Sequence, residues 1–227
     1  MSEPAVFIAG TDTGIGKTHV SCALLHALRQ SGQRACGMKP VASGSEATPQ
    51  GLRNDDALAL QAASGLPMPP YERVNPLALS EPLSPHLAAA RAGVEISLAP
   101  LQAAYRQLRE AYPRVVVEGV GGWLVPLADG LSAADIAREW DLPVILVVGL
   151  KLGCLNHAQL SVRAIQADGC RLLGWIGNRI DPQMAAAEEN IATLEALLPV
   201  PCLGILPHGP APETAAGALT RAVQALQ

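Results

Sequence analysis

The chain has 227 residues, of which 49% are hydrophobic and 3% aromatic, so global disorder is excluded and a single α/β domain with an aliphatic core is favoured. The formal net charge of −4, without a run of lysines or arginines, gives no basic surface for nucleic acid or an anionic membrane, and we expect small molecules as partners. The longest apolar stretch is about half a membrane span, the five cysteines have no metal-binding spacing, and no signal peptide is recognisable, which together predict reduced thiols and a cytoplasmic location.

Short apolar runs alternate with segments of helical length along the whole chain. The runs, expected to be strands, are Ala5–Ala9, Ala35–Met38, Val115–Val117, Val144–Val148, Leu172–Ile176 and Cys202–Leu206. The expected helices are Lys17–Gln30, Asp55–Ser64, Pro85–Ala92, Leu98–Ala111, Ala133–Glu139, Asn156–Ala167, Met184–Leu198 and Glu213–Leu226. Few runs alternate polar and apolar residues, as expected when both faces of a sheet are covered. The pattern predicts one domain, residues 1–227, with a doubly wound, mainly parallel sheet and helices on both faces.

The first apolar run leads into the segment Gly10-Thr-Asp-Thr-Gly-Ile-Gly-Lys-Thr18, directly before the first expected helix. Glycines let successive N–H groups point toward an anion, and the start of a helix favours negative charge. Lys17 supplies a mobile cation, and the Thr18 hydroxyl can bind Mg²⁺. A glycine-rich turn before an ordinary helix would explain the glycines but not the Lys-Thr pair. The segment therefore predicts a P-loop NTPase-like phosphate site, although five residues rather than the usual four separate Gly10 from Gly16.

Polar residues follow the second and third expected strands, at the sheet edge where ligands collect. Lys39 and Ser43 are explained locally by a surface lysine and a turn serine, and only their position beside the loop favours phosphate binding. Glu118 ends three β-branched residues, where an acid is costly unless it is paired or binds a metal; the alternative is an acid that reaches solvent. Asp55 and Asp56 fit a helix start, and one of them also suits Mg²⁺.

The segment Pro40–Pro85 is rich in Pro, Gly and Ser and contains one expected helix. Long irregular segments in compact domains are usually functional or disordered. Because this one has few runs of like charge and includes apolar residues such as Leu77 and Leu83, we expect an ordered wall that faces the substrate.

Two further segments follow the later strands. Residues 149–156, Gly-Leu-Lys-Leu-Gly-Cys-Leu-Asn, lead into a helix whose free N–H groups can bind a substrate carboxylate, while Asn156 equally fits an N-cap. Asn178 ends the fifth run. Its carboxamide donates and accepts hydrogen bonds, as an adenine edge requires, and a turn-forming Asn is an equally good explanation.

These motifs, in this order, closely resemble those of the dethiobiotin synthetase family, and the resemblance covers nearly the whole chain. It rests on residues 10–18, 39–44, 118–123, 144–157 and 174–178, and the spacing of the loop is the family's own form. The resemblance implies a homodimeric ATP-dependent cyclo-ligase of biotin biosynthesis that uses Mg²⁺. It also implies that diaminopelargonic acid, CO₂ and ATP become dethiobiotin, ADP and phosphate through a carbamate and a carbonic-phosphoric anhydride.

Matching positions carry the family's roles onto this chain. Lys17 and Lys39 are implied to be catalytic, and Thr18, Asp56 and Glu118 to bind Mg²⁺. The implied nucleotide contacts are Thr13, Gly14, Ile15, Gly16, Lys17, Thr18, Asn178, Pro207 and Glu213. The implied substrate contacts are Ser43, Lys151, Gly153 and Asn156, with the segment Lys151–Asn156 supplied by the partner subunit, so that the active site lies near the subunit interface. Gly14 stands where some relatives carry Glu and is given no catalytic role.

A different class of protein shares this kind of nucleotide site, namely the partitioning or metal-delivery ATPases, in which hydrolysis switches partner binding. Such switches commonly carry an additional lysine early in the loop, and none stands between Gly10 and Gly16. The last expected helix has only Arg221 as a cation, which disfavours a membrane anchor. An amidoligase would need a glutaminase domain, for which the chain has no room. Turnover that requires a diamino acid would favour the synthetase, and hydrolysis that requires a partner would favour the switch.

Overall fold

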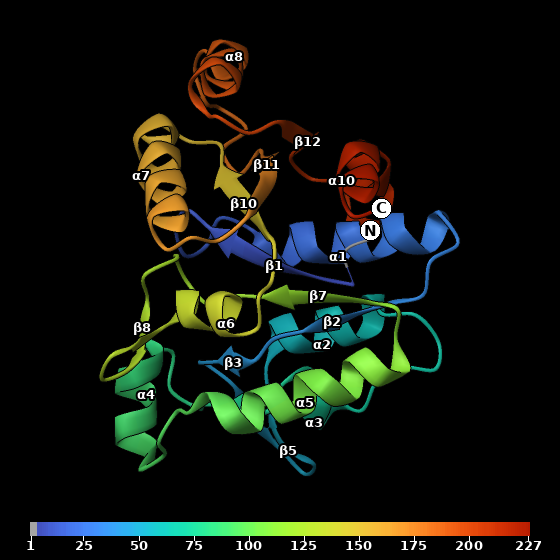
Figure 1. The fold of residues 1–227 in the computed structure, drawn as a ribbon, viewed down its shortest axis with the longest axis vertical. Coiled ribbons are helices and arrows are strands. Elements are labelled where there is room, and N and C mark those ends of the chain that lie inside the picture. The colour runs from blue at the N-terminus through green and yellow to red at the C-terminus, as the bar shows by residue number, and fades with distance from the viewer. Residues whose placement is uncertain (1–3) are drawn as a thin grey trace.

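A six-stranded parallel sheet forms the centre of the fold, in the strand order β12-β11-β10-β1-β7-β2 (Figure 1). The computed structural model describes residues 4–227. The strands are β1 (Ala5–Gly10), β2 (Ala35–Met38), β7 (Arg114–Glu118), β10 (Val144–Gly149), β11 (Leu172–Asn178) and β12 (Cys202–Leu206). Gly10 lies beside Val147 and Gly149 beside Asn178, so the carboxyl ends of the strands meet at one edge. The predicted parallel sheet is confirmed.

Helices cover both faces of the sheet, because successive side chains of each strand point to opposite sides. Phe7 packs in the core beneath one helical layer, and its neighbours Val6 and Ile8 pack beneath the other. The first layer contains α4 (Pro85–Ala92), α5 (Leu98–Ala111), α6 (Ala133–Glu139), α7 (Cys154–Ala167) and α8 (Ala187–Leu197). The second contains α1 (Lys17–Gln30), α2 (Asp55–Ala63), α3 (Tyr71–Val74), α9 (Pro212–Ala215) and α10 (Thr220–Ala225). Full burial of side chains such as Phe7 and Ile8 stabilises the fold by about 1.5–3 kcal/mol each.

The predicted start of α7 at Asn156 is wrong, because the helix begins at Cys154. Gly153 precedes it with a φ of 96°, a left-handed conformation that suits glycine, and it occupies the N-cap position. The interpretation of Asn156 as an N-cap is therefore also wrong. Asn156 lies in the first turn of the helix, with its side chain exposed.

Two other helix predictions need correction near the C-terminus. The helix predicted from Met184 begins only at Ala187, after a run of turns. The last predicted helix, Glu213–Leu226, is divided into α9, a 3₁₀ turn over Ala216–Leu219, and α10. Gly217 lies within the 3₁₀ turn. Glycine is unfavourable inside a helix, because it loses more conformational entropy on ordering than any other residue type. Pro212 suits the first turn of α9, which explains the earlier start.

The segment Pro40–Pro85 is ordered, as predicted. It contains α2 and α3, a parallel pair of short strands, β3 (Val41–Ala42) and β6 (Leu77–Ala78), and a hairpin of β4 (Glu46–Thr48) and β5 (Gly51–Arg53). A second hairpin, β8 (Pro126–Ala128) with β9 (Leu131–Ser132), follows β7 along the chain. The sequence did not predict α3 or these short strands.

The five cysteines are free thiols, and burial raises the pKa of Cys22 and of Cys36 to about 12. Cys22 and Cys36 are therefore protonated at neutral pH and poor nucleophiles. Within residues 4–227, no helix combines the length and the apolar character that crossing a membrane requires.

Candidate active site

The loop between β1 and α1 has the backbone shape of an anion site. Gly14 and Gly16 have φ values of 71° and 79°, which are left-handed conformations. Gly16 also occupies the N-cap position of α1, so the first turn of the helix follows the loop directly. Free N–H groups at a helix start, together with its dipole, favour phosphate. The predicted strand, loop and helix are all present.

Asn178, at the end of β11, supports this loop from the far side of β10, the strand that lies between β11 and β1. Its Nδ2 atom donates a hydrogen bond of 2.8 Å to the carbonyl oxygen of Ile15, and the Asn178 side chain is buried. A Cβ atom on Gly16 would lie only 2.2 Å from this Nδ2 atom. Gly16 therefore allows both the left-handed turn and the close approach of Asn178. The Ile15 side chain is fully buried, so only its backbone faces the loop.

Lys17 reaches back along the loop, and its Nζ donates a hydrogen bond of 2.8 Å to the carbonyl oxygen of Asp12. Burial is the main cause that lowers the pKa of Lys17 to about 8, and the positive charge of Lys39 lowers it further. The ammonium is thus poorly compensated, although Glu118 offsets part of this effect. A phosphate oxygen would supply the missing negative charge.

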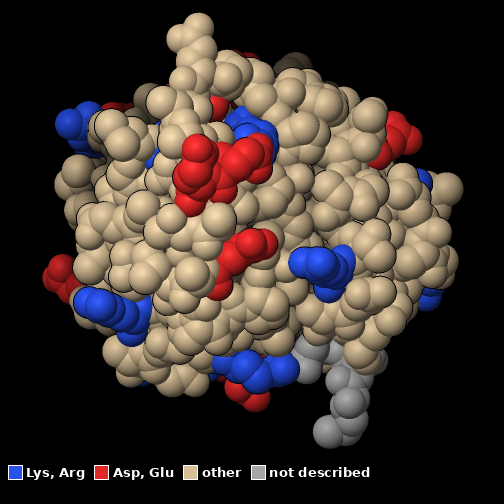
Figure 2. Space-filling view, turned by 90° about the horizontal axis from the view of Figure 1, so that it is seen from above, with Lys and Arg blue, Asp and Glu red and all other residues tan. Residues whose placement is uncertain are grey.

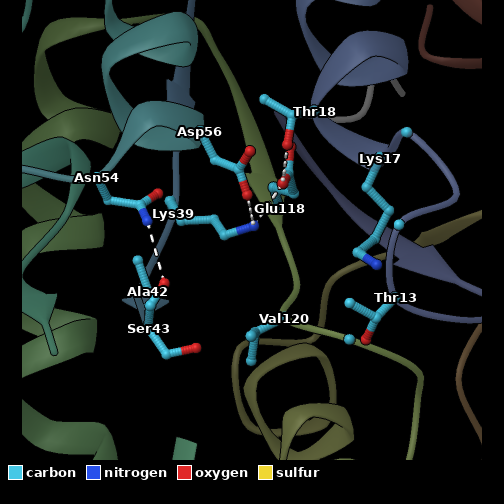
Figure 3. Close-up of a pocket in the computed structure, with 13 residues that line it drawn as sticks. Thr13, Lys17, Thr18, Lys39, Ala42, Ser43, Asn54, Asp56, Glu118 and Val120 are labelled. Carbon is cyan, nitrogen blue, oxygen red and sulfur yellow. Dashed lines mark hydrogen bonds and ion pairs between the residues drawn. The ribbon is translucent and has the colours of Figure 1, made fainter. Parts of the chain in front are cut away.

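A second cluster lies at the ends of β2 and β7 (Figure 3). The Lys39 Nζ atom is 2.6 Å from Glu118 Oε1 and 3.0 Å from Asp56 Oδ2, and the Thr18 hydroxyl donates a 2.8 Å hydrogen bond to Glu118 Oε1. Burial opposes the charge of Lys39, but the two carboxylates outweigh it and raise the pKa of this lysine. Burial likewise opposes the charge of Asp56, and Lys39 outweighs it, so the pKa of Asp56 is lowered.

The cluster fits a magnesium ion. Glu118 is fully buried, and its Oε2 atom has no hydrogen-bond partner among the residues that the structure describes. A buried carboxylate oxygen without a partner is costly unless it meets a cation. Two carboxylates and a hydroxyl are the hard oxygen donors that Mg²⁺ prefers, with water or phosphate completing its coordination. Thr18, Asp56 and Glu118 are therefore able to hold the ion.

These groups line a cavity of about 360 Å³. Its lining residues are Thr13, Gly14, Gly16, Lys17, Thr18, Lys39, Ala42, Ser43, Asn54, Asp56, Glu118, Val120 and Gly121. A second cavity of about 510 Å³ shares Thr13, Ser43, Val120 and Gly121 with the first, so the two are adjacent. The second cavity adds Pro82, Leu83, Ser84, Pro85 and Val125, which give it a more apolar wall. The site thus joins a charged end to a less polar one.

The buried charges of the site contrast with the charges elsewhere on the surface. In Figure 2, acidic and basic side chains are scattered over a mostly uncharged face. Lys39 and Glu118, in comparison, have side chains only 5% and 0% exposed and lie in contact with each other. Two opposite charges removed from water in this way are expensive to keep, which is typical of a functional arrangement.

The structure brings most of the predicted site residues together but leaves some apart. The predicted residues that line neither of the two cavities include these five, all within the described part of the chain: Lys151, Gly153, Asn156, Pro207 and Glu213. Lys151 lies close to the loop all the same, with its Nζ 3.2 Å from Asp12 Oδ2. The other four are exposed at the start of α7 and around β12 and α9.

Asn54 and Asp12 are site residues that the sequence analysis missed. Asn54 is the N-cap of α2 and accepts a hydrogen bond from the Ala57 N–H, and its amide donates to the Ser43 carbonyl oxygen. It thereby joins the segment after β3 to the helix that carries Asp56. Its position just before a predicted helix was the available signal, because Asn is a preferred N-cap. No local pattern marks Asp12.

Comparison with known proteins places the chain in a family. The model of a family described as "AAA domain" matches residues 4–215. A protein of Xanthomonas oryzae pv. oryzae named ATP-dependent dethiobiotin synthetase BioD is 58% identical over 96% of this chain and 97% of its own length. A protein of the same name from Xylella fastidiosa is 58% identical over 92% of each chain. This chain belongs to the ATP-dependent dethiobiotin synthetase family. The resemblance and the enzyme class inferred from the sequence are confirmed.

Solved structures with little sequence similarity share the fold of this dethiobiotin synthetase family member. The MinC:MinD cell division complex of Aquifex aeolicus has a chain with a TM-score of 0.60 at 16% identity, covering 98% of this chain and 94% of that one. MinD from Pyrococcus horikoshii, complexed with Mg-ADP, has a TM-score of 0.56 at 14% identity, covering 98% and 93%. The predicted P-loop NTPase fold is therefore confirmed.

Proposed function

We propose that this protein closes the ureido ring of dethiobiotin, consuming 7,8-diaminopelargonic acid, CO₂ and ATP and releasing dethiobiotin, ADP and phosphate. The observation that carries the proposal is the junction of the two cavities. The phosphate loop and the Lys39–Glu118 pair lie at the charged end, and an apolar wall suited to an aliphatic chain lies at the other. A nucleotide and a diamino acid would meet between them.

The reaction begins when an uncharged amine of the substrate adds to CO₂. A C–N bond forms, the amine loses a proton, and a carbamate with one negative charge results. Lys39 would then exchange part of its pairing with Glu118 and Asp56 for a carbamate oxygen, because its ammonium has three donors. Ser43 lines both cavities, where its hydroxyl would orient the same substrate.

A carbamate oxygen next attacks the γ-phosphorus, and the bond from that phosphorus to ADP breaks. Lys17 would leave the Asp12 carbonyl for the phosphate oxygens, which restores the charge compensation that it lacks in the free protein. Mg²⁺ held by Thr18, Asp56 and Glu118 would neutralise phosphate charge when it is bound. The carbonic-phosphoric anhydride then receives the second amine at its carbonyl carbon, phosphate leaves with the carbamate oxygen, and the ring closes with loss of a proton. Positioning and charge neutralisation account for such a reaction without a protein nucleophile.

The backbone of residues 13–16 would cradle the phosphates, and Asn178 would contact the adenine in addition to supporting Ile15. Pro207 and Glu213 would lie beside the nucleotide. The segment Lys151–Asn156 would serve the substrate's far carboxylate from a partner subunit in a homodimer. Leu152 is 91% exposed within that segment, and such an interface would cover its side chain.

Mass spectrometry of the reaction products tests the function. The purified protein is incubated with diaminopelargonate, bicarbonate and Mg-ATP, and matched reactions contain Lys17→Ala or Lys39→Gln. We expect dethiobiotin from the wild type and a loss of product in both variants. ATP hydrolysis without dethiobiotin would contradict the proposal and favour a nucleotide switch, whereas absence of both would argue against the phosphate site itself.

A further inference from the structure

Asp12 makes three contacts inside the phosphate loop. Its Oδ1 atom accepts a hydrogen bond of 2.8 Å from the Thr13 N–H, and its Oδ2 atom lies 3.2 Å from Lys151 Nζ. Its backbone carbonyl accepts the hydrogen bond from Lys17. The Thr13 hydrogen bond is the main cause that lowers the pKa of Asp12, and Lys151 adds to it, so the side chain is negatively charged at neutral pH.

A negative side chain in this loop needs an explanation, because it repels the phosphates that the loop is shaped to hold. Stability does not provide one. The Asp12 and Lys151 side chains are 46% and 37% exposed, and ion pairs of such exposure stabilise a fold by about 0–1 kcal/mol. Support of the turn at Thr13 does not require a charge either, since an amide oxygen would accept the same hydrogen bond. Of the two lysines beside Asp12, Lys17 bonds only its backbone carbonyl, whereas Lys151 contacts the carboxylate itself.

Lys151 is one of only three lysines in the chain, and the other two, Lys17 and Lys39, line the charged cavity. It follows β10 and precedes α7, whose start carries free N–H groups. An unpaired lysine side chain would sample many rotamers, and a fixed carboxylate restricts it to a few. The ion pair therefore directs the Lys151 ammonium to the junction of the phosphate loop and the start of α7.

We propose that Asp12 is a positioning residue, which holds the Lys151 ammonium of its own subunit in the orientation that receives the far carboxylate of a substrate bound to the partner subunit. The ammonium has three donors, so it contacts Asp12 and a substrate carboxylate at the same time. This inference rests on the proposed function, in which the segment Lys151–Asn156 serves that carboxylate. Asp12 itself touches neither the substrate nor the reacting atoms.

Steady-state kinetics of Asp12→Asn, Lys151→Gln and the double variant test the proposal. The amide keeps the size of Asp12 and the acceptor for Thr13 but lacks the charge. Asp12→Asn is expected to raise KM for diaminopelargonate about two- to fivefold, with kcat changed less than about twofold and KM for ATP unchanged or lowered, because a charge that repels phosphate is removed. Once Lys151 is Gln, Asp12→Asn should have no further effect, because coupled residues are not additive. An equal penalty in both backgrounds, or a change confined to KM for ATP or to kcat, would overturn the proposal.

A second measurement does not depend on turnover. Reductive methylation of the folded protein, followed by peptide mass spectrometry, gives a separate rate for each of the three lysines. An amine reacts only after it leaves its carboxylate partner, so Lys151 should react several-fold faster in Asp12→Asn, while Lys39, which pairs with Glu118 and Asp56, keeps its rate. Equal Lys151 rates in wild type and variant would refute positioning by Asp12. If the wild type makes no dethiobiotin, the proposed function fails, and this rate still decides whether Asp12 holds Lys151.

Discussion

Raising the pH above 8 is expected to weaken nucleotide binding, because the charged form of Lys17 is the one that attracts phosphate. Burial and the neighbouring Lys39 lower the pKa of Lys17 from its usual 10.5 to about 8 in the free protein. At pH 7 about one-tenth of the molecules then have an uncharged Lys17, at pH 8 about half, and at pH 9 about nine-tenths. The affinity for Mg-ADP is therefore nearly constant below pH 7. Above pH 9 it decreases by nearly tenfold for each further pH unit.

Isothermal titration with Mg-ADP measures this directly. Phosphate favours the ammonium, so binding at pH 8 should take up about half a proton per site, and binding at pH 7 about one-tenth. Titrations in buffers of different ionisation enthalpy give these numbers. Lys17→Arg is the matched control, because a guanidinium stays charged across this range and its proton uptake should vanish. Identical pH profiles for the wild type and Lys17→Arg would refute the reasoning that burial leaves Lys17 partly uncharged.

Further substitutions test the other contacts of the site. Glu118→Gln leaves the buried Lys39 without its nearest partner and should lower the free energy of unfolding in urea by about 3–5 kcal/mol; a loss below 1 kcal/mol would contradict the pairing. Asn178→Ala removes the hydrogen bond to Ile15 and should cost about 1 kcal/mol, seen as a roughly fivefold weaker Mg-ADP affinity, whereas unchanged affinity would show that the loop needs no support. Gly16→Ala places a Cβ 2.2 Å from Asn178 Nδ2 at a φ of 79° and should weaken the affinity at least about tenfold, and normal affinity would show that the turn is not required.

The sequence predicted the central fold well because four of the six strands, β1, β2, β7 and β10, are short runs buried on both faces. The run Val144–Val148 differs from β10 by one residue at its end, and α1 has its predicted bounds. The short strands β3 and β6 were not predicted, since two residues give no periodicity and their pairing depends on tertiary contacts. The start of α7 was misplaced because Asn156 is a better N-cap by residue type, and only the left-handed Gly153 shows where the helix begins.

The site was predictable where a motif carries its own chemistry and much less so where the fold brings residues together. Lys17 and Thr18 follow from the loop pattern alone. Lys39 and Glu118 are separated by 79 positions, and their 2.6 Å contact depends on β2 and β7 being neighbours in the sheet. Asp12 was overlooked because its partner, Lys151, is 139 positions away and nothing in the loop pattern calls for an acid.

Transfer of labelled oxygen from bicarbonate is the most direct test of the central claim, that the substrate's carbamate attacks ATP in this site. The protein is supplied with diaminopelargonate, Mg-ATP and bicarbonate carrying ¹⁸O, and short reactions limit exchange with water. The proposed chemistry predicts one ¹⁸O atom in the released phosphate and one in the ureido carbonyl of dethiobiotin. Labelled dethiobiotin accompanied by unlabelled phosphate would contradict it, because water rather than the carbamate would then have attacked the γ-phosphorus.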